Sequence, residues 1–462
     1  MEKTKRKRTE KDKLGEITLP DDALYGIQTA RAAENFALGR QKTNLRLIYA
    51  IVQVKKAAAT TYQSLGIGKE GTYPALVAAC DQVLAGNADE MFIVESLQGG
   101  AGTSTNMNVN EVLANIALRI LGKRCGDYDA VHPLDDVNRG QSTNDVYPTA
   151  LRIAAIELLR TLSGECAALQ ESLQRRENEF DDVKKLGRTE WMDAVPITLG
   201  MEFGAFAQAI ARDRWRLYKI EERLRQVNLG GTAVGLSDAA ERKYRFGVIE
   251  TLRELTGIGL AAAEYPMDVT QNYDVFVEVS GLLKAMAVNL IKISGDLRRM
   301  NSGPRGGLGE IQLAPLQMGS TIMPGKVNPV IPEMITQVCF RVMANDYAIT
   351  AAASHGEFEL NAFSPFIADS LLESLSLLVR AVPLFRTKCI ETLQPNRERC
   401  ENLLNASLAF ATAFVPRLGY DNVSRIIEEN NGDPQKVKTA LENFELNKSD
   451  ENPPRRINIK SH

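Results

Sequence analysis

The stretch that decides the fold is residues 276–300, FVEVSGLLKAMAVNLIKISGDLRRM. Its apolar residues recur at alternating steps of three and four, as on a long helix with one apolar seam: Phe276, Val279, Leu283, Met286, Leu290, Ile293, Leu297 and Met300. Leu282 and Ile291 widen this seam. A helix with such a stripe needs partner helices to cover it, so we predict packing against more than one neighbour.

Comparable helical patterns occur elsewhere, while strand-like alternation is scarce. They cover residues 147–177, 201–225, 332–353 and 363–389, and a shorter one covers 397–413. The first four exceed the average helix of about 11 residues. We therefore predict an all-α fold with a long central helix bundle. Because so many long apolar helices occur in one chain, we expect copies of the chain to complete the core as a homo-oligomer.

We divide the sequence into three lobes. Residues 1–141 form a mostly helical N-terminal lobe, 142–393 the bundle, and 394–462 a small C-terminal helical lobe. The last part, from Asn447, is rich in charge and proline and is expected to be disordered. The basic run Lys3–Arg8 has no apolar stretch after it, so we interpret it as a solvated tail rather than a targeting signal.

Composition narrows the possible functions. The net charge of -3 argues against general binding to nucleic acid or to a membrane surface, and no stretch of about 20 apolar residues is found. The six cysteines are scattered, which predicts free thiols in a reducing cytoplasm. The three histidines show no metal-ligand spacing, so no metal site is predicted.

The most informative polar segment is residues 319–329, GSTIMPGKVNP. It holds a hydroxyl, a cation and an amide, and Pro324 with Gly325 predicts a bend between them. The preceding SGPRGGLG, residues 302–309, is not helical in character. A long loop with polar groups predicts a lid or a binding loop.

Three further polar clusters lie beside predicted helices. Residues 99–108, GGAGTSTNMN, and residues 140–145, GQSTND, each precede a helix. N-capping needs only one such side chain, whereas several hydroxyls at a positive helix end also suit an anion, and both interpretations stay open. The third cluster, GRTEWMDAVP at residues 187–196, is predicted to connect two long helices.

These segments resemble the aspartase/fumarase superfamily. Residues 319–329 are similar to its GSSxMPxKxNP loop, with Thr321 at the position of the second serine. Residues 99–115, 137–154, 187–200 and 302–310 are similar to its other signature segments in the same order, and the resemblance covers about Lys11 to Tyr420. It implies an all-helical homotetramer in which three subunits contribute to each active site.

The resemblance also implies a reaction, the elimination of a group from carbon two of a succinate derivative to leave fumarate. Ser320 would be the catalytic base that removes the Cβ proton, through an aci-carboxylate intermediate. The other substrate ligands would be hydroxyl donors to the β-carboxylate, Thr103, Ser142, Thr143 and Thr321, and groups that hold the second carboxylate, Thr189, Lys326 and Asn328. Fixed donors around such a charge are typically the largest catalytic contribution.

The leaving group depends on one position. Fumarase-like proteins carry histidine where this chain has catalytic Glu190, and the glutamate that supports this position is Glu333. Two close carboxylates favour a cation between them, such as a substrate ammonium, and Asn144 would accept a further hydrogen bond from it. This favours conversion of L-aspartate, a small dicarboxylate, into fumarate and ammonia with no cofactor.

Three alternatives stay open. Residues 131–133, VHP, and 355–361, HGEFELN, look more like fumarase, which favours fumarate hydratase. The glutamate at position 190 is also compatible with a carbon–nitrogen lyase for a substituted aspartate. An inactive structural homologue is the third, although the intact set of Ser320, Lys326, Asn328 and Thr189 argues against it.

Overall fold

The computed structural model describes residues 6–451 and divides into two compact units, each assembled from segments far apart in the sequence. Unit 1 comprises Met1–Cys166, Arg212–Leu290 and Gln337–Val382. Unit 2 comprises Ala167–Ala211, Ile291–Thr336 and Pro383–His462. The division into three lobes stays a prediction.

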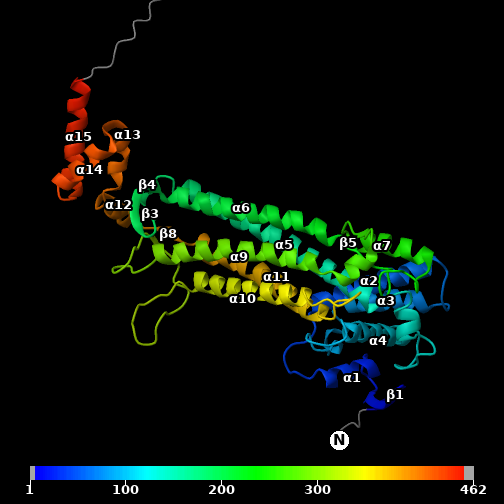
Figure 1. Ribbon diagram of the computed structural model, residues 1–462. Helices are drawn as coiled ribbons and strands as arrows, with labels where there is room; N and C mark the ends of the chain where they lie inside the picture. The colour runs from blue at the N-terminus through cyan, green and yellow to red at the C-terminus, as the bar shows by residue number, and fades with distance from the viewer. Residues whose placement is uncertain (1–5, 452–462) are drawn as a thin grey trace, which may run out of the picture. The chain divides into compact units, whose positions relative to one another are not determined.

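Helices dominate the described residues, so the predicted all-α class is confirmed (Figure 1). The five longest are α5 (Thr143–Glu179), α6 (Leu199–Leu224), α9 (Asp274–Met300), α10 (Val330–Ala353) and α11 (Ser364–Phe385). The shorter ones are α1 (Ile27–Asn35), α2 (Leu45–Ser64), α3 (Thr72–Leu84), α4 (Thr103–Ile120), α7 (Arg242–Thr256), α8 (Pro266–Gln271), α12 (Arg397–Asn405), α13 (Val415–Leu418), α14 (Tyr420–Glu429) and α15 (Pro434–Glu451).

The strands form four two-stranded sheets. The pairs are β1 (Lys7–Asp12) with β2 (Gly15–Pro20), β3 (Lys184–Thr189) with β4 (Met192–Thr198), β5 (Gln226–Val227) with β6 (Ala261–Ala262), and β7 (Ile311–Gln312) with β8 (Gln394–Pro395). All are antiparallel except the β5–β6 pair. The β1–β2 pair precedes the first helix, and the other pairs are formed by segments between helices.

Helix α9 confirms the periodic pattern. All eight residues of its apolar seam are buried, and Leu282 and Ile291 are half-buried beside them. Within unit 1, polar contacts also join α9 to α10. Asp346 on α10 accepts hydrogen bonds from Ser280 (2.9 Å) and Lys284 (2.6 Å) on α9. Polar bonds therefore set how α9 lies against α10, while the apolar seam supplies the core.

Helix α4 begins earlier than its sequence predicts. It starts at Thr103, so the polar cluster at residues 99–108 runs into the helix instead of preceding it. Gly102 turns the chain at this point with a φ of 92°. A Cβ there would lie 2.4 Å from the Tyr147 ring, so both the turn and the close approach require glycine.

The predicted connector between two long helices at residues 187–196 is confirmed, since it lies between α5 and α6, and it belongs to the β3–β4 hairpin. Thr189 pairs with Met192, which leaves Glu190 and Trp191 as a two-residue turn. Their φ values of 51° and 68° are those of a type I′ turn. Such turns usually contain asparagine or glycine, and their absence explains why the sequence gives no hairpin signal.

The ends of the chain also differ from expectation. The tail prediction for the basic run is wrong for Lys7 and Arg8, which belong to β1. Arg8 pairs with Glu10 (2.8 Å) and donates to backbone carbonyls, while Lys3 to Lys5 lie outside the described residues. The helix expected over 397–413 ends at Asn405. Helix α15 continues past Asn447 to Glu451, and residues 452–462 lie outside the described part.

The predicted free thiols are confirmed, because all six cysteines are free; five are buried and Cys125 is half-buried. No helix among residues 6–451 is both long and apolar enough to cross a membrane.

A small helical module at the C-terminal end of unit 2 has its own core. Its buried residues come from the segment Ala409–Phe414 and from α13, α14 and α15: Ala411, Leu418, Val423, Ile426, Val437 and Leu441. Half-buried Phe414 and Phe444 pack against this cluster. The module is therefore held by its own apolar contacts.

Replacing Leu441 by alanine should loosen this module. Leu441 is fully buried, so we expect a loss of about 2–5 kcal/mol in local stability, seen as faster amide hydrogen exchange in α14. Leu446, 63% exposed on the same helix, is the matched control, and Leu446→Ala should change exchange little. Equal effects of both variants would contradict the proposed core.

Candidate functional site

The predicted site residues fall into two sets. Unit 2 contains those on the β3–β4 hairpin and the long loop, and one in the first turn of α10: Thr189, Glu190, Ser320, Thr321, Lys326, Asn328 and, on α10, Glu333. Those at the helix N-termini belong to unit 1: Thr103, Ser142, Thr143 and Asn144. Their roles stay predictions.

The loop at residues 319–329 is folded upon itself. Met323 to Lys326 form a type II turn, with Pro324 second, Gly325 third at a φ of 77°, and a 3.3 Å bond from the Lys326 N–H to the Met323 carbonyl. The Gly319 N–H donates to the Lys326 carbonyl at 2.8 Å. The predicted bend is therefore confirmed, and the turn brings the two arms of the loop together.

Two further features keep these arms together. The Asn328 side-chain amide donates to the Gly319 carbonyl at 2.9 Å. A Cβ at position 319 would lie 2.6 Å from the Lys326 carbonyl oxygen, so only glycine allows this approach. Glycine is therefore required directly before Ser320 for the two arms of the loop to come together.

Ser320 occupies a distinctive position in this loop. Its Oγ accepts hydrogen bonds from the backbone N–H groups of Met323 (2.9 Å) and Ile322 (3.2 Å). Hydrogen bonds to the charged form of a group favour that form, so two donors on Oγ favour loss of its proton. Ser320 is half-buried, while neighbouring Thr321 and Lys326 are exposed.

A cavity of about 1010 Å³ lies in unit 2 beside this loop. Its lining includes Lys326, Asn328, Glu333, Trp191, Arg298 and Arg299. Arg298 forms an ion pair with Glu333 at 3.6 Å. The Arg299 guanidinium lies over the Trp191 ring, 5.1 Å from its centroid. Cation, amide and carboxylate groups therefore share one cavity wall, as a site for a small charged molecule requires.

The sequence reasoning missed both arginines. They end helix α9, where basic residues commonly complement the negative helix end, so nothing in the local pattern marks them as site residues. A usable signal was their place directly before the glycine-rich segment at 302–309. Glu333 is thus paired with Arg298, a residue that the sequence does not mark as part of the site.

Most polar side chains of the first unit 1 cluster serve the fold. Buried Thr105 bonds Gln98, buried Asn106 donates to Thr143 (3.1 Å), and buried Asn108 donates to a backbone carbonyl. Thr103 differs, because it is exposed in the first turn of α4. Most polar residues of this cluster that capping does not need therefore make hydrogen bonds within the fold. Thr103 is left with an accessible hydroxyl.

The second unit 1 cluster lies at the start of α5. Ser142 Oγ accepts the Asn144 N–H at 3.2 Å, which is a capping contact. Thr143 is buried. The Asn144 amide nitrogen donates to the Ala233 carbonyl at 2.8 Å, which leaves its side-chain oxygen to accept. Capping therefore accounts for Ser142 in this structure, and anion binding there remains a prediction.

Buried Asp145 anchors this second cluster. It accepts backbone N–H groups of Ser142 (3.0 Å), Gly230 (3.1 Å) and Thr232 (2.9 Å). Burial raises the pKa of the Asp145 carboxyl to about 7, although these donors and Lys55 oppose the shift. Asp145 thereby ties the loop before α5 to the segment after β5.

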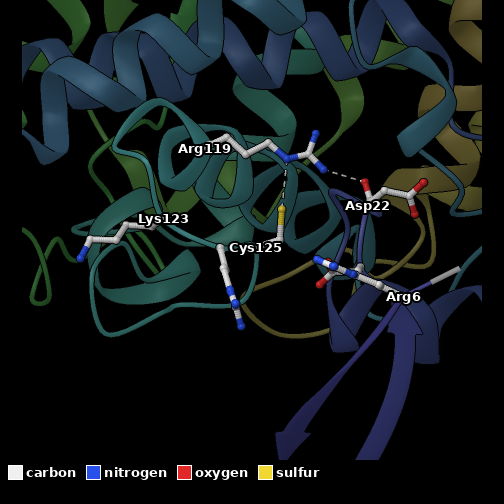
Figure 2. A pocket seen from close by; sticks show the side chains of 7 residues that line it. Arg6, Asp22, Arg119, Lys123 and Cys125 are labelled. Atoms are coloured by element: carbon white, nitrogen blue, oxygen red, sulfur yellow. Dashed lines mark hydrogen bonds between the residues drawn. The ribbon is translucent and has the colours of Figure 1, made fainter.

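A second cavity, of about 400 Å³, lies in unit 1 (Figure 2). Arg6, Arg119, Lys123 and Arg124 line it together with two aspartates and Cys125. Arg119 donates to the Asp22 carbonyl (2.8 Å) and to Cys125 Sγ (3.3 Å). None of the predicted site residues lines this cavity.

Across residues 6–451, no group of three histidine, cysteine, aspartate or glutamate side chains is placed to hold a metal ion. The prediction that no cofactor is used stays a prediction.

Comparison with known proteins places this geometry in a family. A family model described as lyase matches residues 15–344. An aspartate ammonia-lyase of Pseudomonas aeruginosa is 45% identical over 94% of this chain and 90% of its own. A crystal structure of fumarate lyase:delta crystallin from Brucella melitensis bound to cobalt has a TM-score of 0.91 and 44% identity, covering 96% of this chain and 98% of its own. A recombinant class II fumarase from Schistosoma mansoni has a TM-score of 0.91 and 32% identity with the same coverage.

The family match spans well over half of the chain, and the similar proteins cover nearly all of it. Among them are an aspartate ammonia-lyase and a class II fumarase, the two kinds of enzyme that the signature segments resemble. The chain therefore belongs to this lyase family, the aspartase/fumarase superfamily.

Proposed function

We propose that this chain is a carbon–nitrogen lyase that eliminates ammonia from L-aspartate to give fumarate. The observation that carries the proposal is the pair of backbone N–H groups on Ser320 Oγ, in the loop that also carries Lys326 and Asn328. The choice of substrate is supported by the name and the 45% identity of the Pseudomonas aeruginosa aspartate ammonia-lyase.

Ser320 acts in this proposal as the base that removes the Cβ proton. A serine hydroxyl is a poor base unless its oxyanion is stabilised, and the Ile322 and Met323 N–H groups are aimed at that atom. Both donors lie within three residues of Ser320 in the same loop, so they stay close to Ser320 Oγ when the loop moves. Closure over the substrate would exclude water and strengthen both bonds.

The two substrate carboxylates need separate partners. Lys326, Asn328 and Thr189 hold one of them; Lys326 is exposed on the loop and supplies a point charge. Since the Asn328 amide donates to Gly319, substrate must compete with that bond. The β-carboxylate, which gains charge in the aci-carboxylate intermediate, is held by the hydroxyls of Thr103, Ser142, Thr143 and Thr321.

The leaving amine is assigned to Glu190, with Asn144 as a hydrogen-bond acceptor. Glu190 lies in the hairpin turn at a positive φ, next to the cavity residue Trp191. Glu333 is paired with Arg298, so its charge is partly neutralised. Glu190 is then the carboxylate left to attract a substrate ammonium, which favours an amine over water as the leaving group.

We further propose a homotetramer in which three subunits contribute to each site. The resemblance of residues 99–115, 137–154 and 319–329 to signature segments of the superfamily supports shared sites, because that resemblance implies one such segment from each of three subunits. Exposed apolar side chains on α6 and α10 support association: Met201, Trp215, Tyr218, Phe340 and Tyr347. The free cysteines favour the cytoplasm as its location.

A second candidate is a lyase for a substituted aspartate. Trp191 in the cavity wall, stacked by Arg299, offers an apolar face that an unsubstituted ammonium does not need. A panel of amines incubated with fumarate, analysed by mass spectrometry, tests this candidate. Adducts with bulky amines but none with ammonia would favour it over the first.

The reaction itself can be followed by ultraviolet absorbance. Adding the protein to L-aspartate should raise the absorbance as the conjugated diacid forms, while L-malate should give no comparable signal. A flat trace with L-aspartate together with a rising trace with L-malate would identify a fumarate hydratase instead.

Replacing Ser320 by alanine should lower kcat by about 10²–10⁴-fold, the usual contribution of a general base. Ser407 provides a matched control, since its Oγ also accepts a backbone N–H two residues on, that of Ala409 at 3.2 Å. Ser407→Ala should keep wild-type kcat. Equal activity of Ser320→Ala and the parent would remove Ser320 from the mechanism.

A further inference from the structure

A buried ion cluster lies in unit 2, outside the residues assigned above. Glu310 has no exposed side-chain surface, and its two carboxylate oxygens face two cations. Arg188 donates to one oxygen at 2.8 Å, and Lys185 Nζ lies 3.0 Å from the other. Lys185, also almost fully buried, donates to Glu202 at 2.7 Å. Charges are kept in such surroundings only when they are paired, so the four side chains form one unit.

The two cations lie on strand β3 on either side of an irregularity in the hairpin. Lys185 and Arg188 are three positions apart, so in a regular strand their side chains would point to opposite faces. Between Leu186 and Arg188 the register shifts, because β3 advances two residues while β4 advances three, from Pro196 to Asp193; the extra residue of this bulge lies on β4. Both cations contact Glu310, one at each carboxylate oxygen.

Gly187 faces this bulge. A Cβ there would lie 2.7 Å from the Val195 carbonyl oxygen on strand β4. Glycine therefore allows the close approach of the two strands at the position between Lys185 and Arg188.

Glu310 is itself held firmly. Its backbone N–H donates to the Met300 carbonyl at 2.8 Å, at the end of α9, and its carbonyl accepts the Asn396 N–H at 2.8 Å, before α12. The Cys400 thiol is a third partner, 3.5 Å from the same carbonyl oxygen. The carboxylate is thus presented from a backbone fixed on both sides.

The cluster lies between the two site segments of unit 2. Arg188 directly precedes Thr189 and Glu190 in the chain. Glu310 closes the glycine-rich segment at 302–309 and leads through β7 to the loop with Ser320. The contact between Glu310 and Arg188 therefore ties the hairpin, close to its turn, to the segment that leads to the loop.

We propose that Glu310 is a positioning residue that, through Arg188 and Lys185, fixes the β3–β4 hairpin and with it Thr189 relative to the segment carrying Ser320. It touches no substrate. Its kinetic consequence rests on the function proposed above, but its mechanical consequence, a fixed hairpin, does not. The two are therefore tested by different measurements.

Trp191 in the hairpin turn reports the mechanical part. The chain has two tryptophans, so Trp215→Phe leaves Trp191 as the single fluorophore. In that background Glu310→Gln removes the charge that holds Arg188 and Lys185. The fluorescence anisotropy of Trp191 should fall, because the hairpin gains freedom. The conservative variant Glu310→Asp should lower the anisotropy of Trp191 by a smaller amount. It also serves as the test variant if Glu310→Gln does not fold.

Asp213 provides the matched control. It is a buried carboxylate in unit 1, paired with Arg216 (2.6 Å) and bonded by Asn289 (2.8 Å). Asp213→Asn removes a comparable buried charge without touching the hairpin or the loop. It should leave the Trp191 anisotropy at the value of the parent.

Kinetics with L-aspartate separate positioning from folding. A smaller folded fraction lowers kcat and leaves KM unchanged, whereas a displaced Thr189 raises KM as well. We expect Glu310→Gln to raise KM and lower kcat/KM by about 10²-fold, the cost of a misplacement near 1 Å. Asp213→Asn should leave KM unchanged.

Unchanged anisotropy and unchanged KM in both Glu310 variants would overturn the proposal. So would equal changes in Asp213→Asn, which would show a general effect of lost buried charge. If the parent protein does not act on L-aspartate, the proposed function fails while the anisotropy comparison still decides the role of Glu310.

Discussion

The hydrogen bonds that the Ile322 and Met323 N–H groups donate to Ser320 Oγ are the interaction on which the proposed chemistry depends. They exist because the chain doubles back at Pro324 and Gly325 and because Gly319 lets the two arms approach. In the proposed mechanism the loop therefore stabilises the serine oxyanion with its own backbone N–H groups. Such a base would be activated by backbone donors and not by a neighbouring side chain.

A loop of this length needs a rigid base to place its serine, and unit 2 supplies one in its interior. Ion pairs tie Glu310 to the hairpin strand, and backbone bonds tie it to the ends of α9 and α12. The long helices and the buried charge cluster therefore contribute to the structure in different ways. The helices provide the core, and the cluster relates the two irregular segments to each other.

Sequence reasoning was strongest where a physical period was present. The seam of α9 follows from its repeat, and the turn at Pro324 and Gly325 follows from the φ preferences of those residues. Signature segments led to the family, which the comparisons confirm.

The remainder depends on contacts that no local pattern encodes. The turn at Glu190 and Trp191 lacks the residues that usually take positive φ, so the sequence predicts a connector there without indicating its hairpin form. The Arg298–Glu333 pair joins residues 35 positions apart, and Lys185 gives no hint of burial within the charged run DDVKK. Tertiary packing decides all three.

The most direct test of the account is a crystal structure of the assembled protein with a non-reacting four-carbon dicarboxylate bound. We expect Ser320 Oγ at about 3–3.5 Å from the carbon that would lose its proton, with both backbone N–H groups still on Oγ. Thr103 and Ser142 of neighbouring copies should face the same ligand. A closed loop with Ser320 turned away from that carbon would contradict the central claim.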